Sequence, residues 1–132
     1  MLPSFWFCGR PGCSSSLAVL FENGPFKVTS DAGTTLAATP YSWNTVANVI
    51  YIDQPVGTGY SYSSSPTSDD TNELQVGEEV YQFLMTWFKR FPQFIGRKFF
   101  VTGESYGGHC TLVMGICCCY VASIRWYSDI YM

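Results

Sequence analysis

The sequence predicts an α/β fold, in which a parallel sheet forms the core and helices flank it, on two observations. Short apolar segments rich in β-branched or aromatic residues occur at 5–8, 48–53 and 98–102, and each has the length of a buried strand. An amphipathic helical pattern separates the second from the third, and an apolar stretch follows the third. Strands that alternate with helices are typical of a parallel sheet, because parallel neighbours need long crossover connections.

Composition limits the classes of protein that remain. The chain has 132 residues, 47% of them hydrophobic and 13% charged, which fits one modest domain and excludes a disordered or coiled-coil protein. The formal net charge is −3 and no basic cluster is present, so we expect no nucleic-acid partner. The apolar stretch at 110–124 is shorter than the roughly 20 residues that cross a bilayer, so we expect no membrane span.

The first segment, 5–8, is predicted to be a buried strand that ends at a glycine- and proline-containing turn. The serines within 13–16 offer N-cap oxygens for a short helix running to Phe21, and Gly24 and Pro25 end that helix. From 26 to 43 the weak alternation predicts a hairpin or an irregular surface segment.

The strand at 48–53 is predicted to be covered on both faces, because it is apolar throughout. A long helix should follow, with Asp70 as N-cap and Glu73 as its capping-box partner, and Pro92 should end it. Its apolar residues recur at spacings of three and four and predict one broad buried face: Leu74, Val76, Val80, Phe83, Leu84, Trp87, Phe88 and Phe91.

The segment Gly103-Glu104-Ser105-Tyr106-Gly107 directly follows the strand at 98–102 and matches the pattern G-x-S-x-G. In that context the pattern predicts a nucleophile elbow, a tight strand-to-helix turn that exposes a reactive serine hydroxyl. The six cysteines lack the spacing of a zinc site, so we expect no metal centre and no cofactor.

Four blocks in order resemble the serine carboxypeptidases, exopeptidases of the α/β-hydrolase fold. They are Cys13-Ser14-Ser15 after Pro11-Gly12, then Phe21-Glu22-Asn23-Gly24-Pro25, then the segment 48–63 with its Asp53-Gln54-Pro55-Val56-Gly57, and last the segment 103–109. The resemblance implies an N-terminal part of that fold over residues 1–109, truncated after the nucleophile elbow. Residues 110–132 form a divergent apolar tail with no recognised domain.

The resemblance also implies roles for particular residues. Ser105 matches the nucleophile that forms an acyl-enzyme, and the backbone N–H of Tyr106 matches one oxyanion-hole donor. Arg10 stands at the position of the second oxyanion donor. Glu22 and Glu104 match the glutamates that bind the terminal carboxylate of the substrate. The two glutamates and the substrate's terminal carboxylate can cluster only if they share protons, because like charges at close range raise at least one pKa. This accounts for the family's preference for acidic conditions.

Departures from the family pattern predict weak or absent catalysis. Cys8 replaces a carboxylate-binding asparagine and Arg10 replaces a glycine, so hydrolysis should be impaired. After Ser105 the only histidine is His109 and the only acid is Asp129. His109 lies one turn along the following helix, where a structural role is expected, so the chain alone should lack a triad base and be inactive.

The resemblance further implies that Cys13 forms a disulfide with a cysteine far downstream that this sequence lacks. It places the strand at 48–53 on one side of the first strand and the strand at 98–102 on the other. The outer edge of the latter should be exposed and available for association. Family members pass through the secretory pathway to vacuole, lysosome or exterior, although no signal peptide is visible here.

Three functions remain open from the sequence. The first is a serine-type carboxypeptidase that is incomplete in this chain and whose partners are peptide or protein C-termini. The second is a non-catalytic product that binds a full-length relative or peptide C-termini through Glu22 and Glu104. The third is part of an acyltransferase on the same scaffold, in which an alcohol replaces water as acceptor.

Overall fold

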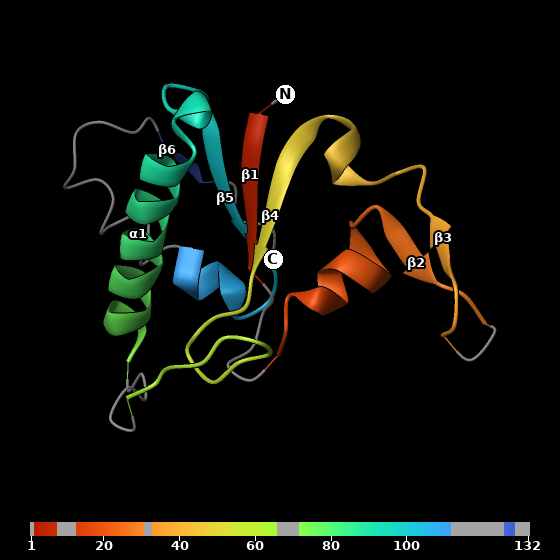
Figure 1. Ribbon diagram of the computed structural model, residues 1–132, viewed down its shortest axis with the longest axis horizontal. Helices are drawn as coiled ribbons and strands as arrows, with labels where there is room; N and C mark the ends of the chain where they lie inside the picture. Colours follow the sequence, from red (N-terminus) through yellow and green to blue (C-terminus); the bar gives the residue numbers. More distant parts are fainter. Residues whose placement is uncertain (1, 8–12, 31–32, 66–71, 112–125, 129–132) are drawn as a thin grey trace.

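The computed structural model describes residues 2–7, 13–30, 33–65, 72–111 and 126–128 (Figure 1). Its main sheet has four parallel strands in the order β4-β1-β5-β6. Their bounds are Leu2–Phe7 for β1, Ala47–Ile52 for β4, Phe99–Gly103 for β5 and Trp126–Ser128 for β6. The parallel α/β architecture and the placing of β4 and β5 on either side of β1 are therefore confirmed.

The register of the central strand aligns the ends of its neighbours. In β1, Trp6 pairs with Tyr51 on one side and with Thr102 on the other. The three strands consequently end at the same edge of the sheet. In an open parallel sheet this carboxyl edge is where ligands usually bind.

The expectation that the outer edge of β5 is exposed is wrong. The strand β6 pairs with it in parallel, with Phe99 opposite Trp126 and Val101 opposite Ser128. Trp126 and Tyr127 are aromatic residues that favour strands, which suits them to extend the sheet. The edge strands of the described sheet are therefore β4 and β6.

Strand β4 is also less covered than its composition predicts. Every residue from Ala47 to Ile52 is half-buried, and none is fully buried. Its place at the edge of the sheet explains this, since one side of an edge strand lacks a neighbour.

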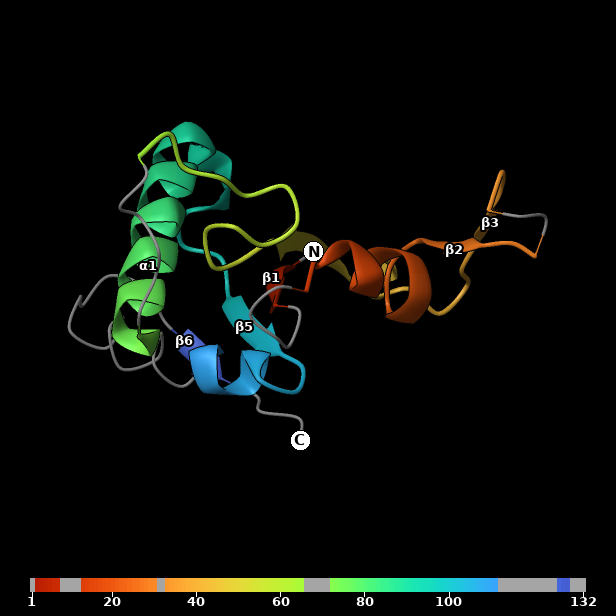
Figure 2. The ribbon, with the colours of Figure 1, turned by 90° about the horizontal axis from the view of Figure 1, so that it is seen from below.

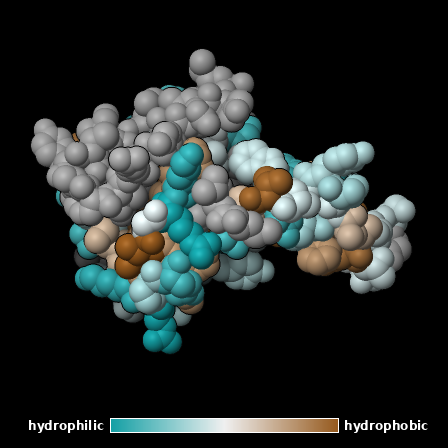
Figure 3. Space-filling view, turned by 90° about the horizontal axis from the view of Figure 1, so that it is seen from above, coloured by the Kyte–Doolittle hydropathy of each residue, from teal (hydrophilic) through white to brown (hydrophobic). Residues whose placement is uncertain are grey.

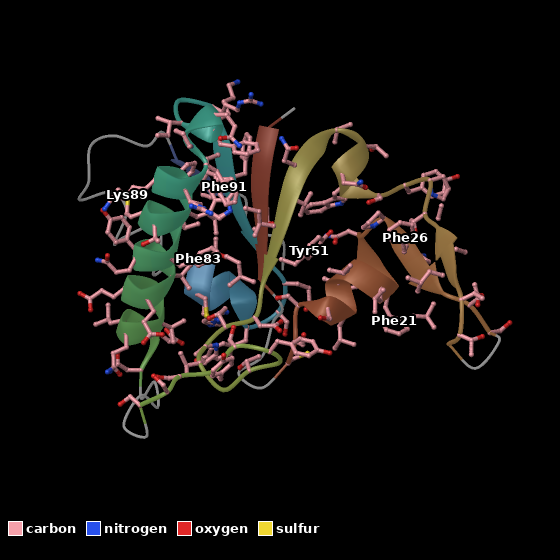
Figure 4. All side chains as sticks on the ribbon, viewed as in Figure 1. Phe21, Phe26, Tyr51, Phe83, Lys89 and Phe91 are labelled. Carbon is pink, nitrogen blue, oxygen red and sulfur yellow. The ribbon has the colours of Figure 1, made fainter. Side chains whose placement is uncertain are left out.

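Helix α1, Glu73–Arg90, supplies most of the described core (Figure 1). One stripe of its side chains is buried together with residues of β5 and the helix that follows it: Val76, Val80, Leu84, Phe88, Phe99, Val101 and Cys110. The stripe is narrower than the predicted face, because Leu74 is 64% exposed and Phe83 and Phe91 are also exposed. Figure 4 shows Phe83 on this helix and Phe91 directly after its last residue.

The start of α1 differs from the prediction. The N-cap is Asn72, whose side-chain oxygen accepts a hydrogen bond from the backbone N–H of Gln75 at 3.1 Å. Asp70 lies outside the described residues. The helix ends as predicted, since Pro92 begins a short 3-10 turn, η3, at Pro92–Phe94. Trp87 packs against the rings of Phe91 and Phe94, with both centroid distances at 5.0 Å.

The segment between β1 and β4 forms a second, smaller part of the molecule. It contains a five-residue π-helix, η1, at Ala18–Glu22, and an antiparallel hairpin of β2, Phe26–Val28, and β3, Leu36–Ala38. A 3-10 turn, η2 at Trp43–Thr45, leads into β4. The hairpin therefore confirms one of the two structures predicted for 26–43.

Figure 2 views the molecule from below and shows the hairpin projecting away from the sheet, at the end opposite α1. Phe26 and Leu36 are each about half exposed on it. In Figure 3, the opposite view, hydrophobic patches on the visible surface are separated from one another by hydrophilic residues. In the part of the chain that the structure describes, no helix is long and apolar enough to span a membrane.

Candidate active site

The turn after β5 has the geometry of a nucleophile elbow. Strand β5 ends at Gly103, and a helix begins four residues later at Gly107. Ser105, between them, has a φ of 55° and is the only non-glycine residue with positive φ in the described ranges. Its side chain is exposed at the carboxyl edge of the sheet. Backbone strain of this kind concentrates at functional sites, where the surrounding structure maintains it.

Close packing explains the glycine at the end of β5. A Cβ added to Gly103 would lie 2.2 Å from the carbonyl oxygen of Gly107 and 2.6 Å from Oγ1 of Thr111. The Thr111 hydroxyl is buried and donates a hydrogen bond to that same carbonyl at 2.8 Å. The end of β5 and the start of the next helix therefore pack with no room for a side chain at position 103. This close contact allows the tight turn between them.

Tyr106, the residue after the serine, is held at two points. Its hydroxyl donates a hydrogen bond to Oε1 of Glu73, the first residue of α1. Its ring stacks on His109, with centroids 5.0 Å apart and an interplanar angle of 22°. The hydrogen bond to Glu73 and then the charge of that carboxylate raise the pKa of the Tyr106 phenol. The stacking gives His109 the structural role predicted for it.

Glu22, at the end of η1, and Glu104, beside the serine, are electrostatically coupled. Partial withdrawal of the Glu22 carboxyl from solvent raises its pKa above 4.5, and the negative charge of Glu104 raises it further. The two carboxyl groups come from elements far apart in the sequence, and the fold places Glu104 near enough for its charge to act on Glu22. Their predicted role in binding the terminal carboxylate of a substrate stays a prediction.

Tyr51 and Asn23 adjoin Glu22, and no sequence motif predicted a role for either side chain in the site. The Tyr51 hydroxyl, at the end of β4, donates a hydrogen bond to Oδ1 of Asn23 at 2.9 Å. Burial and then the charge of Glu22 raise the pKa of Tyr51. Figure 4 shows Tyr51 between β4 and η1. The position of Asn23 next to Glu22 was a signal that could have identified it.

Backbone contacts anchor Asn23 further. Its carbonyl accepts from the Ser42 hydroxyl and from the backbone N–H of Trp43, both at 3.0 Å. Its side-chain nitrogen is buried without a hydrogen-bond partner in the described residues. Asn23 thus joins η1, η2 and β4, and it fixes the chain next to Glu22.

Asp53 holds together the loops around the site. Its Oδ1 accepts from the Ser14 hydroxyl at 2.8 Å and from the backbone N–H of Ser15 at 2.6 Å, and its Oδ2 accepts from the N–H of Tyr60 at 2.9 Å. Gly59, with φ of 55°, approaches so closely that an added Cβ would lie 2.1 Å from that Oδ2. The carboxylate therefore has a structural role, which the sequence indicated only by placing an acid directly after an apolar strand.

Several predicted residues lie outside the described ranges, namely Cys8, Arg10 and Asp129. Tyr106 is described, and its backbone N–H lies in the turn directly after Ser105. Cys13 and Cys110 form no disulfide within the part of the chain that the structure describes.

Known proteins show close similarity to this chain. The family model described as serine carboxypeptidase matches residues 4–114. Serine carboxypeptidase-like 47 of Arabidopsis thaliana is 48% identical over 104 residues, which are 79% of this chain and 20% of that protein. Serine carboxypeptidase 3 of Oryza sativa subsp. japonica is 47% identical over 104 residues, which are again 79% of this chain and 20% of that protein. The chain thus spans about a fifth of the length of these curated relatives.

Among solved structures, Kex1(delta)p, a prohormone-processing carboxypeptidase from Saccharomyces cerevisiae, superposes with a TM-score of 0.77. The match has 29% sequence identity and covers 97% of this chain and 29% of that one.

Proposed function

The chain belongs to the serine carboxypeptidase family and has part of its α/β-hydrolase fold, and from this we propose that it carries the nucleophile and the carboxylate-binding residues of a serine-type carboxypeptidase. The observation that carries the proposal is Ser105, exposed with φ of 55° at the turn between β5 and the next helix. Such a conformation is costly for a serine and is explained by the need to present its hydroxyl.

In the proposed reaction the Ser105 oxygen attacks the last peptide carbonyl of a substrate. The hydroxyl proton passes to a general base and then to the amine of the departing C-terminal residue, as the C–N bond breaks. Water then attacks the acyl-serine ester and releases the shortened peptide. The N–H of Tyr106 would stabilise the negative charge that develops on the carbonyl oxygen in both steps.

Glu22 and Glu104 would bind the terminal carboxylate of the substrate. Two carboxyl groups can approach an anion only when at least one of them carries a proton and donates a hydrogen bond. The raised pKa of Glu22 supports this role, because it extends the pH range in which that proton is present. Binding should therefore strengthen as the pH falls toward 4.5.

We expect the 132-residue polypeptide by itself to be catalytically incomplete. Its only histidine, His109, packs on Tyr106, and no hydrogen bond joins it to Ser105 in the described ranges. A serine hydroxyl without a base remains a weak nucleophile. Binding of peptide C-termini does not need the base, so it should persist. We also propose the secretory pathway as the location, on the family resemblance alone.

Binding of a short peptide with a free C-terminus, compared with its C-terminal amide, tests the proposed site. By calorimetry at pH 4.5 to 7, the free acid should bind more tightly than the amide, with the difference greatest at low pH. The variant Glu104→Ala should abolish the preference, whereas Glu78→Ala, an exposed glutamate on α1, should leave it unchanged. Equal binding of acid and amide by the wild type would overturn the carboxylate-binding role.

A fluorophosphonate probe tests the state of the nucleophile. No labelling of the isolated chain is expected. Labelling that disappears in Ser105→Ala would overturn the claim of incompleteness while supporting Ser105 as nucleophile. Labelling that persists in Ser105→Ala would contradict the assignment of the nucleophile itself.

A further inference from the structure

Tyr106 is hydrogen-bonded to Glu73, a residue that lies outside the family motif at 103–109. We propose that Glu73, at the first residue of α1, is a positioning residue for the nucleophile elbow. It acts through Tyr106, whose ring it holds against His109, and so fixes the residue that follows Ser105. The inference rests on the proposed function only in the role that it gives to the elbow.

Glu73 is not needed to cap α1. The sequence predicts it as a capping-box residue, but Asn72 occupies the N-cap and bonds to Gln75 through both side-chain atoms, at 3.1 and 3.0 Å. The N-terminus of α1 is therefore capped without the Glu73 carboxylate. That carboxylate instead accepts a hydrogen bond from Tyr106, a residue of another element.

The contact between Glu73 and Tyr106 joins two rigid elements across the turn. Glu73 belongs to α1, which packs on β5 through the rings of Phe88 and Phe99, with centroids 5.4 Å apart. Tyr106 stands at the start of the helix after β5, and its backbone carbonyl accepts from the N–H of His109 at 3.0 Å. A hydrogen bond to a carboxylate is stronger than one between neutral groups, so the phenol is held in one place.

Stacking fixes the orientation of the same ring. His109 lies nearly parallel to it, at 22°. With its hydroxyl held by Glu73 and its face covered by His109, the side chain is restrained about both of its rotatable bonds. The strained turn at Ser105 thus has a support on its carboxyl side, in addition to the close contact of Gly103 with Gly107 across the turn.

The titratable groups near the phenol come from two elements. Glu73 reaches it from α1, and His109 and Cys110 belong to its own helix. The Cys110 thiol is buried and adjoins Gln54 of the loop after β4, and burial raises the pKa of that thiol. Removal of the Glu73 carboxylate should therefore change the pKa of the Tyr106 phenol more than removal of any other of these groups.

Nuclear magnetic resonance on the full 132-residue chain tests the proposal. Tyrosines carry carbon-13 at the ring carbon that bears the hydroxyl, and Tyr106→Phe assigns the signal. The variant Glu73→Ala should shift the ionisation midpoint of Tyr106 down toward 10, the ordinary value for tyrosine. The backbone order parameter of Tyr106 should fall in the same variant, from about 0.85 to below about 0.6.

A conservative variant separates positioning from general stability. Glu73→Gln keeps an acceptor oxygen but no charge, so the midpoint should fall while the order parameter is retained. Glu78→Ala, on the exposed side of the same helix, should change neither. An unchanged order parameter in Glu73→Ala would overturn the proposal, whether or not the midpoint moves. Failure of the chain to bind peptides would leave these signals unaffected, so the two hypotheses fail separately.

Discussion

Replacement of Gly103 by alanine should strongly destabilise the chain, because the new methyl group has no space. It would lie 2.2 Å from the carbonyl oxygen and 2.3 Å from the carbonyl carbon of Gly107, whereas ordinary contacts are 3.4 Å or longer. The obstacle is backbone at the start of a helix, so the helix must shift by roughly 1 Å to restore ordinary contact. Overpacking of this kind costs about 1–3 kcal/mol, and we expect a value of about 3 kcal/mol here.

Gly96→Ala is the matched control. Gly96 has φ of 79° and no atom within 4 Å of an added Cβ, so alanine there meets backbone strain but no steric overlap. Left-handed backbone costs a non-glycine residue roughly 1–2 kcal/mol, part of which the loss of unfolded-state freedom offsets. The expected cost is therefore about 1 kcal/mol.

Urea unfolding followed by tryptophan fluorescence measures both free energies of unfolding. A Gly103→Ala variant no less stable than Gly96→Ala would refute the reasoning. A double variant, Gly103→Ala with Thr111→Ala, identifies the obstacle. It removes the hydroxyl at 2.6 Å but leaves the backbone carbonyl, so stability should not recover. Recovery would show that the threonine side chain, and not the backbone, limits the packing.

Three further predictions concern the site and its loops. Ser105→Gly should be about 1 kcal/mol more stable than Ser105→Ala in urea, because glycine relieves the strain at φ of 55° and alanine retains it. Glu22 has a raised pKa in the folded state, so its contribution to stability is present below pH 4.5 and is lost as the pH rises through the folded value. Glu22→Gln should therefore gain stability relative to wild type at pH 7 but not at pH 4 in thermal melts, and an advantage that grows on acidification would contradict the sign. Asp53→Ala should lower the free energy of unfolding in urea by about 3 kcal/mol, because three donors lose their acceptor. Asp53→Asn should cost less, because one acceptor oxygen remains. Equal costs would show that the hydrogen bonds from Ser14, Ser15 and Tyr60 are not what the carboxylate contributes to stability.

Local sequence pattern was sufficient to predict the elements marked by an apolar run or by a helical periodicity. Apolar runs identified β4 and β5 to within one residue, and the spacing of Val76, Val80 and Leu84 identified the buried stripe of α1. The glycines around Ser105 predicted the elbow, and at Gly103 the structure shows why glycine is needed, since an added Cβ would overlap the backbone of Gly107.

Long-range pairing was beyond the reach of local pattern. Nothing in Trp126–Ser128 indicates that these residues extend the sheet beside β5, because a parallel partner is chosen by the whole fold. The N-cap was missed since Asn72 and Asp70 are both good caps and only the helix packing selects between them. The Tyr51 contact to Asn23 joins residues far apart in sequence, and no periodicity could have indicated it.

The order of the strands has a consequence for the nascent chain. Strand β1 is synthesised before both of its partners in the sheet: Leu2 pairs with Ala47, and Ser4 pairs with Phe100. On the ribosome, therefore, an apolar strand has one unpaired side until the residues around Phe100 have emerged. High contact order of this kind slows folding, and strand edges left open during synthesis favour aggregation. We accordingly expect chaperones that bind extended apolar segments to engage β1 until β5 has been synthesised.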